Sequence, residues 1–337
     1  MRPTLHSIAE RVGVSDMAVS LALRGKGRIS PDVRQRIIEV AAELGYRPNT
    51  AARAMTSGRL GCVALLLSTS KQVSNLPHLM LDGIDDGLQS LDYHLSVAHL
   101  RDEQLVDPKR FPKLLRELLA DGVLINYHFR VPQGLIDTID RQKIPSVWIN
   151  RKQPHDAVRP DDEAAGRILT EHLLAVGHRR IAYVDLSHVA EQPDEHYSAA
   201  DRLQGYRSAM QSAGLPPRVV HRLPEGVEAS FRRCIDLLRE PNRPTALVCY
   251  SGSTATTASL AAARVGIDVP TDLSITMIED RPLTVGKPIT LAALPMNAVG
   301  RQASEMLLEK IRSPERRPTV VVPPTLRPGG TVAPAGS

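Results

Sequence analysis

The sequence predicts a small all-α head followed by an α/β body made of two doubly wound parallel-sheet lobes. The chain of 337 residues has room for two or three domains. Residues 1–60 contain three short amphipathic segments, whereas residues 61–330 alternate apolar runs with amphipathic segments. The positive charge is confined to the head: residues 1–60 hold ten Lys and Arg against five Asp and Glu, and the remaining residues hold 32 of each. A basic head on a neutral body is typical of a nucleic-acid reader with a second function.

Composition excludes other classes of protein. Hydrophobic residues make up 42% and charged residues 23% of the chain, values typical of folded domains rather than disordered ones. The apolar run Cys62–Leu67 is far too short to span a bilayer, and the polar N-terminal residues do not resemble a secretory signal. We therefore expect a cytosolic protein without a membrane partner.

Motifs of catalysis and metal binding are missing from the sequence. Cys62, Cys234 and Cys249 are not at the spacings of metal or redox sites. No nucleophile elbow, phosphate-binding loop or HExxH motif occurs, and the adjacent acids Asp85-Asp86 and Asp161-Asp162 point apart on a helix or strand. We expect no enzyme activity, no catalytic residue, no metal and no cofactor.

Three helices are predicted in the head, each from a cap, an apolar stripe and a closing glycine. The caps are Thr4 or Ser7, then Ser15, then Ser30 followed by Pro31. The helices end at Gly13, near Gly25 and at Gly45. The second helix covers Asp16–Leu23, and the third runs to about Leu44.

The spacing of Ala9, Gly13 and Val19 predicts a helix-turn-helix. The small Ala9 allows the second helix to cross closely, Gly13 makes the tight turn, and Val19 packs the second helix on the first. A three-helix packing module that does not bind DNA has the same pattern and remains an alternative.

The second helix would then present its outward face to the major groove. That face is poor in hydrogen-bonding side chains; Met17, Ala18 and Leu21 can contact thymine methyl groups, and Ser20 and Arg24 can hold phosphate. The full set of expected DNA-contacting residues in the head is His6, Ser15, Asp16, Met17, Ala18, Ser20, Leu21, Arg24, Ser30 and Arg34, with Arg28 as a further backbone contact.

The body is predicted as two sets of strands and helices separated near Arg159–Asp162. The expected strands are Cys62–Leu67, His94–Ala98, Val123–Ile125, Ser146–Ile149, Ile181–Val184, Arg218–Leu223, Ala246–Cys249 and Ser274–Ile278. The expected helices are Leu79–Leu91, Pro112–Leu119, Leu135–Arg141, Glu163–Val176, Asp201–Ala213, Ser230–Arg239 and Thr254–Val265. Such alternation implies parallel sheets with right-handed crossovers.

The last part of the chain is expected to return to the first lobe through Leu291–Ile311 and Thr319–Val322 and then to fray over Thr325–Ser337, which is rich in Pro and Gly. The predicted boundaries are 1–48 for the helix-turn-helix and 49–60 for a hinge or linker. The body is expected over 61–330, with lobe one at about 61–159 plus 291–322 and lobe two at about 162–288. The tail is expected over 325–337.

A ligand site is expected in a cleft between the lobes, because open α/β sheets bind ligands at the carboxyl ends of their strands. The candidates just beyond strands are Ser68-Thr69-Ser70, Asn126-Tyr127, Asn150-Arg151, Asp185, Tyr250-Ser251 and Glu279-Asp280. Trp148, Tyr127, Phe129, Tyr197 and Tyr250 can stack on a sugar face, although core or rim packing is the more common role for each of them.

Several motifs resemble the LacI/GalR family of bacterial transcriptional regulators over roughly residues 4–330. They are Thr4-Leu5-x-x-Ile8-Ala9, Gly13-Val14-Ser15, Ala18-Val19-Ser20, Gly45-Tyr46-Arg47-Pro48-Asn49-x-Ala51-Ala52-Arg53 and Gly177-His178-Arg179-Arg180-Ile181-Ala182. The resemblance implies a helix-turn-helix head, a hinge helix that forms on DNA, and a periplasmic-binding-protein-like body that binds an effector.

The resemblance also implies how the hinge contacts DNA. Paired hinge helices enter the minor groove and insert an apolar wedge at the central step. Asn49 would cap this helix, Ala52 would lie on it, and Met55 stands where the family usually has Leu. Met is apolar and long enough to unstack a base step, so we expect the wedge to function.

The effector residues implied by the resemblance are partly altered. Arg202 lies in a segment similar to RxxGF, whose Arg contacts effector hydroxyls in the family. Asn150 replaces an Asp of IPVVxIDR, Ser251-Gly252 replaces Asn-Asp, and Glu279 replaces the first Asp of GFDD. With Ser68, these residues form the expected site for a small polar effector, a sugar or sugar-like molecule. A different small molecule, or a cleft that no longer binds one, remain alternatives.

The most consistent interpretation is a sequence-specific regulator, a repressor in most of this family, that binds a palindromic operator as a homodimer. Its location would be the bacterial cytoplasm, on the nucleoid when bound. One rival is a small-molecule-binding or enzymatic body with an incidental head. Another is a sequence-indifferent architectural protein, which the weakly polar face of the second helix favours.

Overall fold

A computed structural model describes residues 3–49, 58–69, 74–89, 91–105, 112–128, 130–189, 196–223 and 226–335. Contacts divide the chain into two compact units, Met1–Leu60 and Gly61–Ser337. The predicted hinge contacts Ala52 and Met55, and the candidate stacking residue Phe129, lie outside the described residues.

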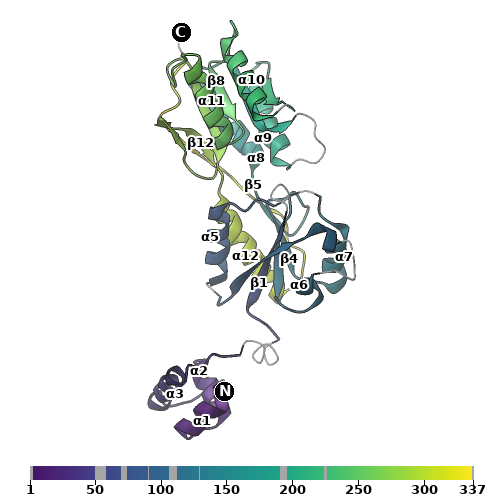
Figure 1. Cartoon of the computed structure of the whole chain (residues 1–337), viewed down its shortest axis with the longest axis vertical. Helices are drawn as coiled ribbons and strands as arrows, with labels where there is room; N and C mark the ends of the chain where they lie inside the picture. The colour runs from purple at the N-terminus through teal and green to yellow at the C-terminus, as the bar shows by residue number, and fades with distance from the viewer. Residues whose placement is uncertain are drawn as a thin grey trace. The chain divides into compact units, whose positions relative to one another are not determined.

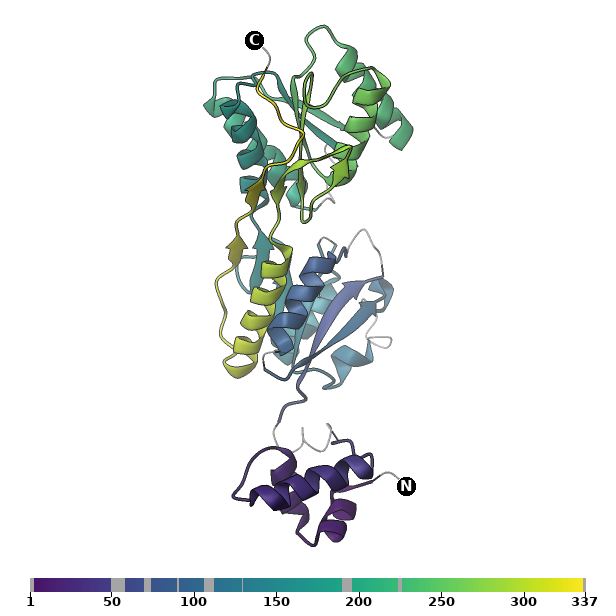
Figure 2. The same ribbon diagram turned by 90° about the vertical axis from the view of Figure 1, so that its left-hand side faces the viewer.

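The head consists of α1 (Leu5–Val12), α2 (Asp16–Leu23) and α3 (Pro31–Glu43), as Figure 2 shows. Each helix begins at its predicted cap: Thr4 and Ser7 form a capping box, Ser15 accepts from the backbone of Ala18, and Ser30 accepts from that of Val33. Gly13 ends α1 with a φ of 78°, which a glycine adopts without strain. The helices enclose a core of Ile8, Ala9, Val19, Ala22, Ile37, Val40 and Ala41.

The first lobe of the body is a six-stranded parallel sheet in the order β13-β5-β4-β3-β1-β2. Its strands are β1 (Cys62–Ser68), β2 (His94–Leu100), β3 (Gly122–Asn126), β4 (Ser146–Ile149), β5 (Ala157–Pro160) and β13 (Val320–Val322). Its helices are α5 (His78–Gln89), α6 (Lys113–Arg116), α7 (Gln133–Gln142) and α12 (Met296–Arg312), with a short 3-10 turn, η1 (Asp102–Gln104).

Alternation along β1 explains why helices cover both faces of this sheet (Figure 1). Val63 and Leu65 pack into one core with α5 and α12, whereas Ala64 and Leu66 pack into another with α6 and α7. Glycines allow α5 and α12 to approach closely, because a Cβ at Gly300 would lie 2.1 Å from the carbonyl oxygen of Met80.

The second lobe contains a six-stranded sheet in the order β14-β12-β9-β8-β6-β7, parallel except for β14. Its strands are β6 (Ile181–Val189), β7 (Arg218–Arg222), β8 (Ala246–Cys249), β9 (Ser274–Glu279), β12 (Thr290–Ala293) and β14 (Thr325–Arg327). Its helices are α8 (Asp162–Ala175), α9 (Ser198–Ser212), α10 (Val227–Arg239) and α11 (Gly252–Arg264). A small hairpin, β10 (Thr284–Val285) and β11 (Lys287–Pro288), lies apart from the sheet. Both lobes agree with the predicted fold class.

The chain crosses between the lobes three times within the body. The first crossing leads from β5 to α8, the second from β12 to α12, and the third from β13 to β14. Figure 2 shows the last strands beside the crossing segments. The segment beginning at Leu291 therefore corrects our expectation, because Leu291–Ala293 belongs to the second sheet and only α12 and β13 return to the first.

The predicted frayed tail is also wrong over the described residues up to Ala335. β14 pairs antiparallel with β12, and Thr331 is only 2% exposed. Thr331 donates to the carbonyl of Ile275 at 2.7 Å and accepts from the backbone of Thr290 at 3.0 Å. The Pro and Gly content hid this order, because the tail is stabilised by hydrogen bonds to the sheet rather than by an apolar pattern.

Candidate functional site

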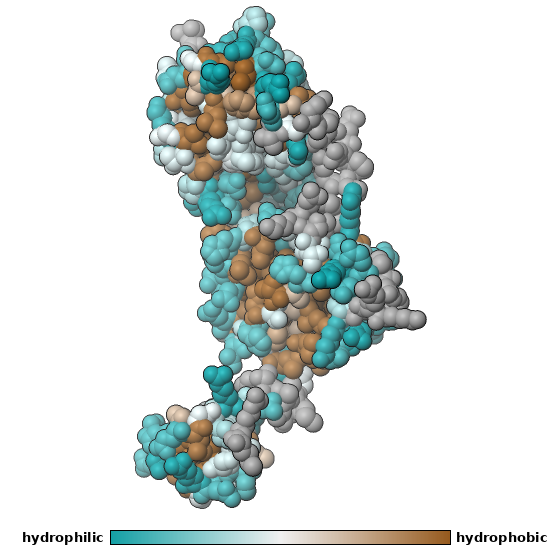
Figure 3. All heavy atoms as spheres, in the orientation of Figure 1, coloured by the Kyte–Doolittle hydropathy of each residue, from teal (hydrophilic) through white to brown (hydrophobic). Residues whose placement is uncertain are grey.

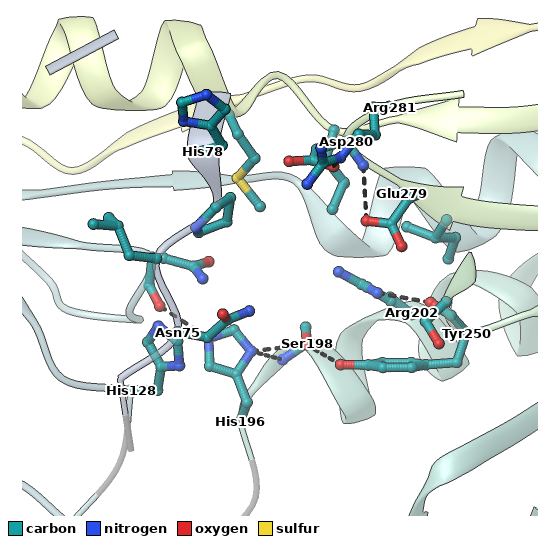
Figure 4. Close-up of a pocket in the computed structure, with 17 residues that line it drawn as sticks. Asn75, His78, His128, His196, Ser198, Arg202, Tyr250, Glu279, Asp280 and Arg281 are labelled. Carbon is teal, nitrogen blue, oxygen red and sulfur yellow. Dashed lines mark hydrogen bonds and ion pairs between the residues drawn. The ribbon is translucent and has the colours of Figure 1, made fainter. Parts of the chain in front are cut away.

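A cavity of about 520 Å³ lies between the lobes at the carboxyl ends of the strands. Figure 4 shows polar side chains from both lobes around its open centre. The lining residues are Asn75, Leu76, Pro77, His78, His128, Asn150, His196, Ser198, Arg202, Tyr250, Ser251, Ile278, Glu279, Asp280, Arg281, Leu294 and Met296.

Four of the five predicted effector residues line this cavity, namely Asn150, Arg202, Ser251 and Glu279. Ser68 does not. It is 3% exposed, and its hydroxyl donates to the carboxylate of Asp102 at 3.1 Å. Its backbone N–H donates to Ser74 Oγ at 2.8 Å, and Ser68 does not line the cavity.

Arg202 on α9 is held rigidly at the base of the site. Its Nε donates to Asp162 Oδ1 and its Nη1 to the carbonyl of Tyr250, both at 2.7 Å. The guanidinium also stacks 4.4 Å from the ring centre of Tyr250. Burial acts to lower the pKa of Arg202, but Tyr250 and Asp162 outweigh it and raise that pKa. Figure 4 shows the free end of the guanidinium reaching into the cavity.

Glu279 at the end of β9 supplies a fixed carboxylate. Its Oε2 accepts from the backbone of Gly252 at 3.1 Å, and its Oε1 accepts from the backbone of Asp280 at 3.1 Å. Gly252 is the first residue of α11, so the carboxylate lies at the positive end of that helix. Burial, and then the charge of Glu279, raise the pKa of the adjacent Asp280.

His196 links the two lobes beside the cavity. Its Nε2 lies 3.0 Å from the carbonyl of Asn150, which can only accept, so Nε2 carries the proton. Burial lowers the pKa of His196 to about 4, so its Nδ1 is unprotonated and accepts from Ser198 Oγ at 2.7 Å. Ser198 then accepts from the hydroxyl of Tyr250 at 2.8 Å. The hydrogen bonds therefore all run the same way: Tyr250 donates to Ser198, Ser198 donates to His196, and His196 donates to the carbonyl of Asn150.

Asn150 and His128 complete the wall on the side of lobe one. Asn150 has a φ of 53°, which Asn tolerates better than most residues, and its side-chain oxygen accepts from the hydroxyl of Tyr197 at 3.1 Å. The rings of His128 and His196 meet edge to face at 4.5 Å. Burial, and then His196, lower the pKa of His128 to about 3.

Sequence reasoning missed the lining residues that follow a strand by two or more positions or that begin a helix. His128 and His196 lie in connections whose length gave no signal, Ser198 begins α9, and Asn75 and His78 precede or begin α5. Of the aromatic candidates within the described residues, only Tyr250 lines the cavity; Tyr127 is fully buried and donates to Asp102 at 3.1 Å. The guanidinium of Arg151 lies over the ring of Trp148, and both Lys152 and Arg159 lie over the ring of Tyr197.

The head places several of the predicted DNA contacts at the exposed N-terminal end of α2. Met17 is 65% exposed, and Asp16 lies 3.3 Å from His6 Nδ1. Ser15 and Ser30 act as helix caps, and Ala18 is half-buried. Asn49 is exposed at the end of the described head.

Other predicted contacts are engaged within the head. Arg24 turns back on its own helix, donating to Ser20 Oγ at 2.9 Å and to the Ser20 carbonyl at 3.0 Å. Leu21 packs against the turn, where a Cβ on Gly27 would lie 3.2 Å from it. Arg34 donates to the carbonyl of Ala22 in α2 and to those of Lys26 and Gly27 in the α2–α3 connection. Arg34 therefore stabilises the turn, and its predicted contact with phosphate stays a prediction.

Metal ligands do not cluster within the described ranges: no group of three His, Cys, Asp or Glu is placed to hold an ion. The same part of the chain contains no helix long and apolar enough to cross a membrane. All three cysteines are buried, and burial raises their pKa values, which makes them poor nucleophiles.

Comparison with known proteins agrees with this two-part organisation. Residues 4–49 match the bacterial regulatory proteins of the lacI family, and residues 170–332 match the periplasmic binding protein-like domain. The HTH-type transcriptional regulator GntR of Escherichia coli is 30% identical over 100% of this chain and 98% of its own. DegA of Bacillus subtilis, another HTH-type transcriptional regulator, is 28% identical over 97% of each chain.

A solved structure of the lac repressor dimer, bound to operator and an anti-inducer, shares the fold. Its TM-score is 0.76 at 22% identity, covering 99% of this chain and all of that one. A LacI-family regulator from Mycobacterium smegmatis is 28% identical with a TM-score of 0.61, over 81% of this chain and 99% of its own. These relatives are transcriptional regulators and not enzymes. The chain belongs to the LacI family of bacterial transcriptional regulators.

Proposed function

We propose that this regulator binds a palindromic operator as a homodimer, acts as a repressor, and is controlled by a small polar effector, sugar or sugar-like, in the interlobe cavity. The observation that carries the proposal is the cavity itself. Its polar groups come from both lobes, with Asn150 on one side and Arg202 and Glu279 on the other. A ligand that contacts both sides favours one lobe angle over another and can thereby couple to DNA affinity.

The cavity chemistry supports a hydroxylated ligand. The open end of Arg202 donates hydrogen bonds, and the carboxylate of Glu279 accepts them. A hydroxyl group can accept from the first and donate to the second at the same time. Arg202 is paired with Asp162, so its charge is compensated before any ligand binds.

Exposed apolar side chains support self-association. Figure 3 shows apolar residues gathered on the visible face of the first lobe. Leu91 is 44% exposed before β2, Val97 is 46% exposed on β2, and Leu118 is 74% exposed after α6. Burial of exposed apolar side chains favours self-association, and a dimer reads two half-sites.

Selection of bound duplexes from a random DNA pool by the full-length protein tests the DNA part. We expect a palindrome with a deformable central step, and loss of that palindrome in Met55→Gly, whose site lies outside the described residues. Sedimentation equilibrium should give a dimer. Enrichment of no sequence, together with a steep salt dependence on every duplex, would support architectural binding instead.

Thermal unfolding in the presence of a panel of monosaccharides, polyols and sugar acids tests the effector part. We expect at least one compound to raise the unfolding temperature and to change the affinity for the selected operator. Glu279→Gln should lose the shift, and Glu305→Gln, a half-exposed glutamate on α12, should keep it. If no compound in a wide panel or in cell metabolite extract changes the unfolding temperature, the effector proposal fails.

A further inference from the structure

Asp16 and Met17, the first two residues of α2, have the side chains of that helix that are best placed to reach base edges. Met17 is 65% exposed, and the Asp16 side chain is 54% exposed. In a helix-turn-helix, the N-terminal residues of the second helix contact the bases. Arg24 and Leu21, farther along α2, are engaged by Ser20 and by the turn at Gly27.

Asp16 is unusual for a DNA-facing position because phosphates repel a carboxylate. Its Oδ1 lies 3.3 Å from His6 Nδ1, and the other ring nitrogen of His6 lies 3.4 Å from Glu10. The N-terminus of α2 stabilises the negative charge further. The carboxylate is thus held in place on the head without a direct Lys or Arg partner among the described residues.

A carboxylate only accepts hydrogen bonds, which restricts the base it can read. In the major groove, cytosine presents an amino donor, whereas guanine presents two acceptors. Adenine places its N7 acceptor beside its amino group, so a carboxylate there meets repulsion as well as attraction. Cytosine is therefore the best partner for Asp16.

Met17 offers no hydrogen-bond donor, and its flexible thioether chain is apolar. The apolar group exposed in the major groove is the C5 methyl of thymine. We propose that, in each half-site, Asp16 selects a cytosine through its amino group and Met17 selects a thymine through its methyl group. This inference rests on the proposed binding of a palindromic operator.

Selection from a random duplex pool with Asp16→Asn, Met17→Ala and Glu10→Gln full-length variants tests the assignment. The wild type should enrich one cytosine and one thymine in each half-site. Asp16→Asn should replace the cytosine by adenine, because an amide can pair with both N7 and N6 of adenine. Glu10→Gln removes a carboxylate that contacts the same histidine, and it should leave the selected sequence unchanged.

A second measurement isolates the methyl contact. Replacing the selected thymine by uracil removes only the methyl group, and the wild type should then bind about fivefold to tenfold more weakly. Met17→Ala should bind the two duplexes equally. Met17→Ala should bind an unrelated duplex as tightly as the wild type does, which excludes misfolding of the head.

The outcomes distinguish a failure of this base assignment from a failure of the proposed binding to a palindromic operator. If the wild type enriches no palindrome, the proposed operator binding fails. If it enriches a palindrome but Asp16→Asn selects the same base at every position, the role of Asp16 is wrong. If uracil and thymine bind the wild type equally, the role of Met17 is wrong.

Discussion

Gly252 leaves open the space that the Glu279 carboxylate occupies. A Cβ on Gly252 would lie 3.0 Å from Glu279 Oε2, and the Gly252 N–H donates to that oxygen at 3.1 Å. The family motifs have Asp at position 252, where this chain has glycine. At position 279 they have Asp, whose side chain is shorter than that of Glu279. In this chain the missing side chain of Gly252 and the added length of Glu279 therefore complement one another, and β9 provides the carboxylate at the start of α11.

We expect Gly252→Ala to weaken effector binding about tenfold while leaving stability nearly unchanged. Alanine favours the helix, but its methyl group forces the carboxylate to move. Calorimetric titration with the compound found in the thermal panel measures the effect. Leu260→Ala, a change at an exposed residue farther along α11, serves as the control. Equal affinity of Gly252→Ala and wild type would show that the position of this carboxylate does not matter.

Acid should destabilise the body through the two interlobe histidines. Burial lowers the pKa of His196 to about 4 and that of His128 to about 3, below the usual value of about 6.5 in an unfolded chain. The unfolded state therefore binds more protons as the pH falls below about 6.5. Each histidine should cost about 2 kcal/mol of unfolding free energy at pH 5 relative to pH 7.5.

Urea denaturation at several pH values measures this dependence. His196→Gln keeps a donor for the Asn150 carbonyl but does not titrate, so between pH 7.5 and pH 5 its unfolding free energy should fall by about 2 kcal/mol less than that of the wild type. His155→Gln, an exposed histidine outside the cavity, should keep the full slope. Parallel curves for wild type and His196→Gln would contradict the assigned burial.

The sequence predicted the two-lobe fold because apolar strands and amphipathic helices leave clear periodic patterns. It missed β5, whose Ala157–Pro160 contains an arginine and a proline, and β14, which has no apolar pattern. It also placed Leu291 in the wrong lobe, since an apolar strand does not reveal which of two sheets it joins. Long-range backbone pairing decided all three.

The cavity was predictable where its residues directly follow a strand or belong to a family motif, as Asn150 and Glu279 do. It was not predictable for His128 and His196, whose contact across the cleft depends on the packing of the two lobes. Ser68 also ends a strand, yet its hydroxyl is turned toward Asp102. Strand ends identify the edge of a sheet, but side-chain hydrogen bonds decide which residues reach the ligand.

The C-terminal segment should contribute to the stability of the second lobe. We expect Thr331→Val to lower the unfolding free energy by about 2 kcal/mol, because it leaves the buried N–H of Thr290 unpaired and removes a donor to Ile275. Thr325→Val, an exposed change in β14, should cost much less. Urea denaturation of the full chain measures both, and equal values would mean that the tail does not support the lobe.

Comparing Arg34→Ala with Arg28→Ala should distinguish an arginine that stabilises the head from one that contacts phosphate. Arg34→Ala removes hydrogen bonds to the carbonyls of Ala22, Lys26 and Gly27, so we expect the helices of the head to exchange amide hydrogens faster in the full chain. The loss should amount to about 1–3 kcal/mol of local stability and should weaken binding to all duplexes alike. Arg28 is exposed, and Arg28→Ala should leave hydrogen exchange unchanged while reducing the slope of log K against log salt by about one. If Arg34→Ala instead changes only the salt slope, with normal exchange, its guanidinium contacts phosphate and the carbonyl contacts are incidental.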